Sequence, residues 1–448
     1  MNINFLLERG DNDKEALLWK NKFYTYSYLK NNITKCSDYL LPNGIKKNSV
    51  VGLSGDFSPN TISILFSLIK FNCIIVPFDA KQKNNNKQKY DIARIEFLIT
   101  VNKNEKIKIS KTKFFEIHEF YNSLIKNNIP GLVMFTSGTS GIPKAAVHDL
   151  AKLLEKFRYE RKALRTLNFL LFDHWGGLNT MFHVLSNGGV VITTNDRNPE
   201  SVCKLVEKCK IELLPTSPTF LNLMLLSGAY KKYNLDSLKI ISYGTEPMPE
   251  NILLKLKMIF PKVKLQQTYG LIELGVLRSK SEKDDSLWVK IGGEGYKTRI
   301  VNNILQIKAE SAMLGYLNAR SPFTDDGWFI TGDEVLQKGE YIKILGRKSE
   351  IINVGGEKVY PQEVENVIQN IPNVMEVLVY KEKNQIMGSI VCAKVRLVKD
   401  EDHKIFSKKV KVYCKKNLEK YKVPVKIKIT SEKLFSERLK KSRVKSIN

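Results

Sequence analysis

The residues best suited to carry chemistry lie in one short segment, VMFTSGTSGIPKAAVH at positions 133–148. Small residues allow backbone amides to approach phosphate oxygens, hydroxyl groups add donors, and a lysine supplies a positive charge. The segment offers all three types in Thr136, Ser137, Gly138, Thr139, Ser140, Gly141 and Lys144. It lacks the GxxxxGK[ST] spacing of P-loop nucleotide-binding proteins. A Ser/Gly linker is the alternative, but the Pro-Lys pair is unusual in linkers, and we interpret the segment as a phosphate-binding loop.

Six further segments give this loop a context. Together with the loop they resemble, in sequence and in order, the adenylate-forming superfamily of AMP-dependent synthetases and ligases, which includes acyl- and aryl-CoA ligases, nonribosomal-peptide adenylation domains and firefly luciferase. The segments are DFSPNTISILFSLIKFNCIIVPFD (56–79), FDHWGGLNTMFHVLSNGGVVI (172–192), YGTEPMPE (243–250), TYGLIELG (268–275), DDGWFITGDEV (325–335) and GRKSEIINVGGEKVYPQEVE (346–365). The resemblance covers nearly the whole chain and implies that ATP is bound.

The segment TYGLIELG contains the residues that this resemblance assigns to the metal and the base. Glu273 would bind the Mg²⁺ ion that bridges the ATP phosphates, and Tyr269, followed by Gly270, would stack near the adenine. A carboxylate is the usual protein ligand for Mg²⁺, although a lone glutamate is also common in surface ion pairs. The family usually has Thr or Ser where this chain has Ile272, which implies the loss of one hydroxyl contact to the α-phosphate.

Asp333, in the turn Thr331-Gly332-Asp333, is similar to the family carboxylate that accepts both ribose hydroxyls. The alternative is a simple Asx turn. Arg347 would contact the ribose or a phosphate from the domain junction.

The carboxylate substrate is expected beside FDHWGG, where two glycines on a loop would make room for a ligand. His174 would lie at the mouth of the pocket as a catalytic residue, and the alternative is a structural histidine. Tyr243, Gly244 and Thr245 would form another wall, and Gly244, Thr245 and Glu246 would also contact the nucleotide. A residue placed like Asp173 grips the α-amino group in amino-acid-activating relatives, so an amino acid stays open as the substrate.

The C-terminal segments are expected to complete the reaction. By the resemblance, a mobile lysine neutralises charge as the acyl carboxylate meets the α-phosphate. Lys441 aligns best, Lys440 and Lys445 are alternatives, and a solvated charge run is the other interpretation of this tail. Gly355 and Gly356 would line the tunnel for a phosphopantetheine arm, because glycine lets a narrow thiol carrier pass close to the backbone.

The elements that must position these residues alternate between helical stretches and short β-branched runs. Such runs occur at 50–55, 73–79, 131–138 and 188–194, and their alternation predicts an α/β architecture with largely parallel sheets. By the resemblance, the fold is a large N-terminal domain of layered α/β subdomains with a small β-barrel-like subdomain, followed by a small mobile α+β C-terminal domain. We place the domains at 1–345 and 346–448, with Ser349 at the hinge and a helix starting at Pro361.

The amino-acid composition limits the kinds of binding partner that we expect. The formal net charge is +26, and residues 346–448 hold 24 Lys and Arg against 12 Asp and Glu. A basic C-terminal domain would suit coenzyme A or an acidic carrier protein, although genomic nucleotide bias also enriches Lys. Nucleic acid is not expected, because no aromatic-basic repeat accompanies the charge. The six cysteines show no CxxC pairing and suggest neither zinc nor disulfides.

No export or membrane signal is predicted. The start, MNINFLLERGDNDKE, has acidic residues where a signal peptide would need a basic lead and an apolar run. The apolar stretch 61–78 is interrupted by Lys70 and Asn72, so we expect a helix followed by a strand and a cytoplasmic protein.

The reaction expected from the resemblance has two steps. A carboxylate and Mg-ATP give acyl-AMP and pyrophosphate, and the thiol of coenzyme A then captures the acyl group. Two alternatives stay open: loading of an acyl or amino acid onto a carrier-protein phosphopantetheine, and a non-catalytic relative that only binds nucleotide or acyl groups.

Overall fold

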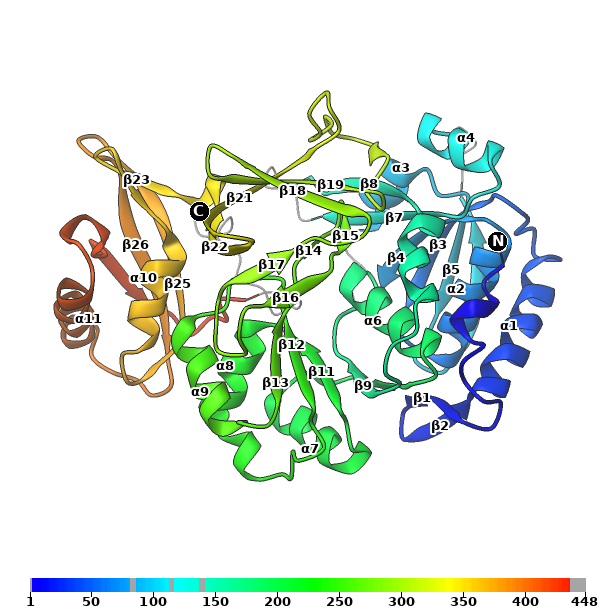
Figure 1. The fold of residues 1–448 in the computed structure, drawn as a ribbon, viewed down its shortest axis with the longest axis horizontal. Coiled ribbons are helices and arrows are strands. Elements are labelled where there is room, and N and C mark those ends of the chain that lie inside the picture. Colours follow the sequence, from blue (N-terminus) through cyan, green and yellow to red (C-terminus); the bar gives the residue numbers. More distant parts are fainter. Residues whose placement is uncertain (1, 81–85, 113–116, 137–141, 436–448) are drawn as a thin grey trace.

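The structure is a computed structural model that describes residues 2–80, 86–112, 117–136 and 142–435. Within these residues the strands form four larger sheets and one two-stranded hairpin. Figure 1 shows the C-terminal residues, coloured orange to red, as a separate body at one end of the molecule. The predicted fold class is confirmed.

The first sheet carries the phosphate-binding loop. Its strand order is β20 (Gly315–Tyr316), β8 (Lys144–Asp149), β7 (Gly131–Thr136), β4 (Ile74–Asp79), β3 (Val50–Gly55), β5 (Phe97–Val101) and β6 (Ile107–Lys111). β3, β4, β5 and β7 are parallel neighbours. Every residue of β3 and β4 is buried, which is typical of strands covered on both faces. The associated helices are α1 (Tyr26–Leu40), α2 (Pro59–Lys70), α3 (Asn86–Ala93), α4 (Glu119–Lys126) and α5 (Leu150–Glu155).

The second sheet is also largely parallel. Its order is β13 (Lys264–Gln267), β12 (Ile240–Tyr243), β11 (Leu213–Thr216), β9 (Arg165–Asn168), β10 (Val190–Thr193), β1 (Glu15–Trp19) and β2 (Lys22–Thr25). Its helices are α6 (Trp175–Ser186), α7 (Pro199–Cys209), α8 (Pro218–Ser227) and α9 (Glu250–Ile259). α7 and α8 each start with a capping Asn or Ser followed by Pro, a pairing that satisfies free amides and presets the first helical φ.

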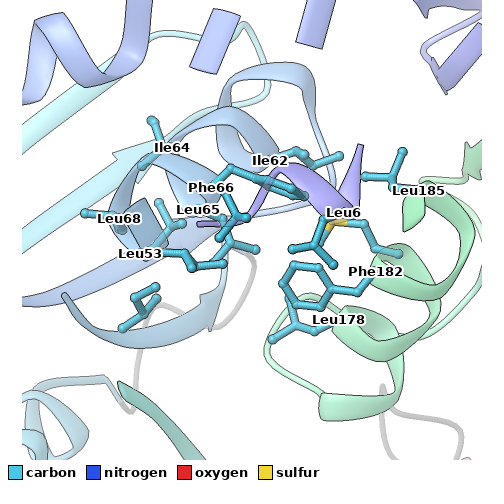
Figure 2. Packing of buried hydrophobic residues seen from close by; sticks show 14 of the residues in the cluster. Leu6, Leu53, Ile62, Ile64, Leu65, Phe66, Leu68, Leu178, Phe182 and Leu185 are labelled. Atoms are coloured by element: carbon cyan, nitrogen blue, oxygen red, sulfur yellow. The ribbon is translucent and has the colours of Figure 1, made fainter. Parts of the chain in front are cut away.

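The two sheets meet through α2 and α6. Figure 2 shows Phe66 of α2 and Phe182 of α6 in one apolar cluster with Leu6 and Leu178. The rings of Phe66 and Phe182 have centroids 5.8 Å apart. α2 matches the helix expected in the apolar stretch 61–78, and its burial explains why that stretch is so apolar. This packing fixes α6, which carries the predicted acid-binding residues, relative to the first sheet.

The expected β-barrel-like subdomain takes the form of an antiparallel sheet beside a short hairpin. The sheet order is β16 (Ser279–Ser281), β17 (Val289–Ile291), β22 (Tyr341–Arg347), β21 (Phe329–Lys338), β19 (Ile304–Ala309) and β18 (Tyr296–Val301). In the described parts of the chain its edge strands β16 and β18 do not pair, so the sheet is open there. The hairpin consists of β14 (Gly270–Leu271) and β15 (Gly275–Val276).

The C-terminal body contains its own sheet and two helices. The strands are β24 (Glu357–Val359), β23 (Ile352–Val354), β26 (Gly388–Leu397), β25 (Val374–Asn384) and β27 (Lys426–Ile429), and the helices are α10 (Pro361–Gln369) and α11 (His403–Asn417). Short 3-10 turns are η1 (Asn4–Leu6), η2 (Lys156–Arg158), η3 (Ala229–Lys231), η4 (Lys348–Glu350) and η5 (Lys420–Lys422). The chain changes sheets at η4, which contains Ser349. The expected boundary before residue 346 falls inside β22, because Gly346 and Arg347 still pair with β21.

The C-terminal body contacts the rest of the protein at β21 and at α8. Lys358 of β24 forms an ion pair of 3.1 Å with Glu334 of β21. Asn222 of α8 donates a hydrogen bond of 3.4 Å to the carbonyl of Met375. None of the described helices combines the length and the apolar composition needed to cross a membrane.

Candidate active site

The mouth of the phosphate-binding loop is a β-hairpin. Thr136 ends β7, Lys144 begins β8, and the two residues pair directly across the ladder. The loop residues between them that were predicted to bind phosphate, Ser137, Gly138, Thr139, Ser140 and Gly141, lie outside the described residues. Asn318 braces the loop exit: its amide donates to the Pro143 carbonyl at 2.9 Å and its oxygen accepts from the Ala145 amide at 3.0 Å.

Glu273 and Lys144 both contact Tyr316. Glu273 lies in the turn of the β14–β15 hairpin, and its Oε1 accepts a hydrogen bond of 2.5 Å from the Tyr316 hydroxyl. The Lys144 ammonium lies 5.4 Å from the centre of the Tyr316 ring. Burial, and then the negative charge of Glu273, raise the pKa of Tyr316, so this tyrosine stays a donor. The structure thus brings the predicted metal ligand next to the base of the phosphate-binding loop.

The carboxylate of Glu273 is suited to an ion that takes most of its ligands from elsewhere. No group of three or more His, Cys, Asp or Glu side chains arranged to hold a metal occurs among the described residues. Mg²⁺ in nucleotide sites is commonly held by one or two carboxylates together with substrate phosphates and water. Ile272, next in the chain, is half-buried and packs on two apolar clusters, which explains an apolar residue at this position.

Asp333 is the centre of a second polar cluster. Its Oδ2 accepts from the Tyr269 hydroxyl at 2.5 Å, and its Oδ1 lies 2.8 Å from Arg347 Nε. Arg347 pairs with Asp333 across the β21–β22 ladder and also donates to the Thr331 carbonyl at 2.5 Å. Burial and the Asp333 charge raise the pKa of Tyr269. The three predicted nucleotide residues therefore lie together around one carboxylate.

The β14–β15 hairpin connects the two clusters. Tyr269 directly precedes the hairpin and Glu273 forms its turn. Gly270 is exposed and pairs with Val276. A Cβ on Gly270 would lie 3.0 Å from the Gly275 carbonyl, so the glycine permits close pairing of the two short strands.

The segment after β12 forms another wall. A Cβ on Gly244 would lie 2.5 Å from Thr268 Oγ1 and 2.7 Å from the Thr268 carbonyl, so glycine is required there. Thr245 is exposed and has a φ of 71°, a strained value for a β-branched residue. Glu246 accepts a hydrogen bond of 2.7 Å from the Thr219 amide in the first turn of α8, so its carboxylate also has a capping role that the sequence did not reveal.

α6 starts at the predicted acid pocket. His174 caps this helix, and its Nδ1 accepts from the Gly176 amide at 3.0 Å. Asp173 is buried. A Cβ on Gly176 would lie 2.6 Å from the Leu170 side chain, and one on Gly177 would lie 2.4 Å from the Leu171 carbonyl. Gly177 is therefore required for close packing against the backbone of the preceding turn, whereas Gly176 faces the end of a leucine side chain. The interpretation that the two glycines make room for a ligand stays a prediction.

The glycines predicted to face the thiol carrier lie at a hairpin tip. Gly355 and Gly356 connect β23 to β24, are exposed, and have φ values of 59° and 93°, which glycine adopts without strain. The same hairpin carries Lys358, which contacts Glu334 beside Asp333. Lys441 and its alternatives Lys440 and Lys445 lie outside the described residues.

Tyr316 and Asn318 were missed by sequence reasoning. They lie outside the recognised motifs and reach the site because β20 pairs with β8, with Tyr316 opposite Ala146. β20 has only two residues, so neither alternation nor length could have marked it as a strand.

Comparison with known proteins places this arrangement in a family. Residues 8–303 match the profile of AMP-binding enzymes, and residues 363–441 match that of the AMP-binding enzyme C-terminal domain. An indoleacetate–CoA ligase of Aromatoleum aromaticum is 29% identical over 297 residues, covering 59% of this chain and 57% of the relative. A putative long chain fatty acid-CoA ligase, VraA, of Staphylococcus epidermidis is 23% identical over 442 residues, covering 94% and 92%. The chain thus spans less than two thirds of the first relative and most of the second.

Two solved structures share the fold. The anthranilate CoA ligase AuaEII, in complex with anthranoyl-AMP, superposes with a TM-score of 0.81 at 18% identity, covering 99% of this chain and 95% of that one. ATP-bound MatB from Rhodopseudomonas palustris has a TM-score of 0.79 at 19% identity, covering 97% and 96%.

Proposed function

This chain belongs to the AMP-binding enzyme family, and we propose that it is an AMP-forming acid-thiol ligase. A carboxylic acid and ATP would give acyl-AMP and pyrophosphate, and a thiol would then take the acyl group and release AMP. One observation carries the proposal: the β14–β15 hairpin joins the Glu273–Tyr316–Lys144 cluster to the Tyr269–Asp333–Arg347 cluster. One cluster suits phosphates and the other a nucleoside.

In the first step, an oxygen of the acid attacks the α-phosphorus of ATP while the bond to the bridging oxygen of pyrophosphate breaks. Lys144 and the phosphate-binding loop would hold the departing pyrophosphate and offset its charge. The hydrogen bond from Tyr316 would fix one oxygen of Glu273, so that the other oxygen serves as the Mg²⁺ ligand. Mg²⁺, when bound, would neutralise part of the charge on the phosphates.

Asp333 would accept the ribose hydroxyls, which donate two hydrogen bonds that a carboxylate can receive together. Arg347 would stay paired with Asp333 and reach a ribose or phosphate oxygen. Tyr269 would contact the adenine, and its hydroxyl would stay on Asp333. Gly244, Thr245, Glu246 and Gly270 would complete the nucleotide site, where Gly244 brings backbone groups close to the ligand.

In the second step, coenzyme A is the proposed thiol. Gly355 and Gly356 would line the path of its phosphopantetheine arm. A lysine of the C-terminal tail, with Lys441 as the preferred candidate, would instead act during adenylation, the first step. The excess of Lys and Arg after residue 346 would attract the phosphates of coenzyme A. It would equally suit an acidic carrier protein, which stays the second candidate acceptor. The relatives named for aryl and fatty acids support an aryl or acyl substrate. We also propose that the protein acts in the cytoplasm.

Two domains would carry out these steps, residues 1–345 and 346–448. Rotation about Ser349 in η4, where the chain changes sheets, would move the C-terminal body between an adenylating and a thiol-accepting pose.

Exchange of labelled pyrophosphate into ATP, measured across a panel of aryl, fatty and amino acids, tests the first step. We expect exchange with at least one acid, and a Glu273→Gln variant should lower it by roughly a hundredfold or more, as is typical when an electrostatic catalytic group is removed. Glu340→Gln is the matched control, because Glu340 is exposed and forms an ion pair with the likewise exposed Lys290. Tight ATP binding without exchange for any acid would identify a non-catalytic binding protein and refute the proposal.

A further inference from the structure

The helix α11 of the C-terminal body carries more positive charge than the rest of the chain. Six of its 15 residues are Lys and none is Asp or Glu, whereas Lys and Arg make up 72 of the 448 residues of the chain, against 46 Asp and Glu. A general enrichment in Lys would affect all helices alike, but α7 and α9 contain acidic as well as basic residues. The charge of α11 is therefore a local feature.

One side of α11 is anchored in the core of the C-terminal body. The helix packs against α10 and β27, and Phe406, Val410 and Cys414 are fully buried in the apolar cluster of this body. Asp402 caps the first turn, where its carboxylate accepts hydrogen bonds of 2.9 Å from two backbone amides. Capping and burial hold the helix in place, so its outer side is presented in a fixed orientation.

The outer side of α11 presents a stripe of lysines with two apolar residues among them. Residues three, four and seven positions apart lie on the same side of a helix. The α11 stripe has this spacing and consists of six exposed residues, Ile405, Lys408, Lys409, Val412, Lys415 and Lys416. Ile405 is 65% exposed and Val412 is 47% exposed. The stripe extends over about 17 Å of the helix.

Most of the charge on the α11 stripe is not compensated within the protein. Lys409 forms an ion pair of 3.5 Å with Glu401. Among the described residues, no carboxylate pairs with Lys408, Lys415 or Lys416. Figure 1 shows α11 at the outer end of the C-terminal body, on the side away from the two parallel sheets. The stripe is therefore accessible to a large partner.

The combination of charged and apolar residues indicates the class of partner. Lysines alone would suit any polyanion, but dissolved phosphate or a nucleic acid backbone offers no apolar contact for Ile405 and Val412. An anionic lipid bilayer offers both kinds of contact, because its headgroups are negatively charged and the acyl chains begin directly beneath them. Lysine side chains can reach the headgroups while their stems cover apolar surface.

We propose that the α11 stripe docks the protein on an anionic membrane surface, with its lysines at the lipid phosphates and with Ile405 and Val412 at the boundary of the acyl chains. Docking would be peripheral and reversible, because two apolar side chains bury far less apolar surface than stable anchoring requires. This inference goes beyond the proposed function and does not depend on it, since only the outer side of α11 is involved. A solvated helix without a partner, and an acidic protein in solution, are the competing explanations.

Sedimentation of the full chain with lipid vesicles tests the docking. Vesicles of phosphatidylcholine alone are compared with vesicles that also contain phosphatidylglycerol. We expect binding to the anionic vesicles and roughly tenfold weaker binding, or none, to the neutral ones. Raising the salt concentration from about 0.05 M to about 0.5 M should weaken the binding strongly, because salt screens exposed charges. Equal binding to both kinds of vesicle, or binding to neither, would overturn the proposal.

A triple variant that combines Lys408→Gln, Lys415→Gln and Lys416→Gln locates the binding surface. One lysine at an anionic surface strengthens binding by roughly fivefold, so the affinity for the anionic vesicles should fall by about tenfold to a hundredfold. Glutamine is a good helix former and the three positions are exposed, so α11 should stay folded. Wild-type affinity in this variant would overturn the proposal.

The matched control removes the same charge from the N-terminal part of the chain. Lys35, Lys46 and Lys47 are exposed, and their joint replacement by Gln should lower the affinity for the anionic vesicles by less than about threefold, because salt screens distant charges. An equal loss in the control and in the α11 variant would show that only the net charge matters and would overturn the proposal.

A double variant, Ile405→Gln with Val412→Gln, tests the apolar contact. The affinity for the anionic vesicles should fall by about tenfold, as expected for two partly buried aliphatic side chains. Unchanged affinity would overturn the bilayer as the partner. Binding of the wild type to soluble polyglutamate in place of the vesicles would also overturn it and would indicate an acidic protein.

Discussion

The buried ammonium of Lys156, the first residue of η2, makes a prediction about stability that needs no substrate. In the unfolded chain this lysine titrates at its usual pKa of 10.5, and in the folded protein burial lowers that pKa to about 7. The folded state therefore binds the proton less tightly than the unfolded state. Replacement by methionine keeps the length of the side chain and removes the charge, so Lys156→Met should relieve this cost.

The size of the effect follows from the two pKa values. A fall from 10.5 to about 7 corresponds to at most about 5 kcal/mol, because a tenfold change in proton affinity is worth about 1.4 kcal/mol. The side chain keeps some accessible surface, and water there screens the charge, so we expect roughly half of this value, about 2 to 3 kcal/mol. The lost hydrogen bond to the Val276 carbonyl would subtract about 1 kcal/mol at every pH.

The direction of the pH dependence of the free energy of unfolding follows from proton linkage. Between pH 7 and 10.5 the unfolded chain holds a proton that the folded protein has released, so this group makes the free energy of unfolding of the wild type rise with pH. Below pH 7 its full cost is present, and above pH 10.5 it vanishes. The advantage of Lys156→Met over the wild type should therefore be greatest near pH 6.5 and disappear by about pH 10.5. The neighbouring His183 does not obscure this window, because its pKa of about 4 keeps it neutral throughout.

Urea denaturation of both proteins at several pH values between 6.5 and 10.5 measures the difference. Other titrating groups affect both proteins alike and cancel. Lys152→Met, at an exposed lysine of α5, is the control and should show a difference from the wild type that does not depend on pH. A pH-independent difference for Lys156→Met as well would show that the ammonium is not desolvated and would refute this reasoning.

Two further variants address the site. Tyr316→Phe removes the hydroxyl that donates a hydrogen bond to Glu273. The loss of one hydrogen bond to a carboxylate costs about 2 kcal/mol, so the KM for Mg-ATP in pyrophosphate exchange should rise roughly tenfold or more. An unchanged KM would show that Tyr316 does not support metal binding. Asp333→Asn removes the charge that faces Arg347 and the acceptor of the Tyr269 hydroxyl, so ATP affinity in calorimetry should fall by about 2 kcal/mol or more, and wild-type affinity would refute the ribose role.

Much of the fold follows from local patterns in the sequence. The β-branched runs predicted strands that the structure confirms at Val50–Gly55, Ile74–Asp79, Gly131–Thr136 and Val190–Thr193, because continuous apolar runs of this length suit strands buried on both faces. The helix predicted at Pro361 is α10. The boundary predicted before residue 346 stays a prediction, and the structure adds that β22 continues through Gly346 and Arg347, which pair with β21.

The site was predictable only where one motif holds the chemistry. Glu273, Asp333 and Lys144 were predicted as site residues because their neighbours in the chain mark them, and their roles stay predictions. Glu246 was assigned to the nucleotide, yet its carboxylate also caps α8, and Gly177 serves the packing of α6. In both cases the partner is a backbone group whose position depends on how a helix is docked, and the sequence does not state that.

The sequence by itself determined the family, the order of the motifs and the charged residues that are predicted to surround the phosphates, because these depend on residue types at short spacing. Only the tertiary structure decided which residues contact these charged residues. Tyr316 reaches Glu273 through a two-residue strand, and Lys156 reaches Val276 from 120 positions away. Such contacts depend on strand register and helix docking, which many buried residues fix together. The predicted phosphate-binding loop is therefore marked by neighbouring residues in the chain, while the contacts of Tyr316 and Lys156 exist only in the folded protein.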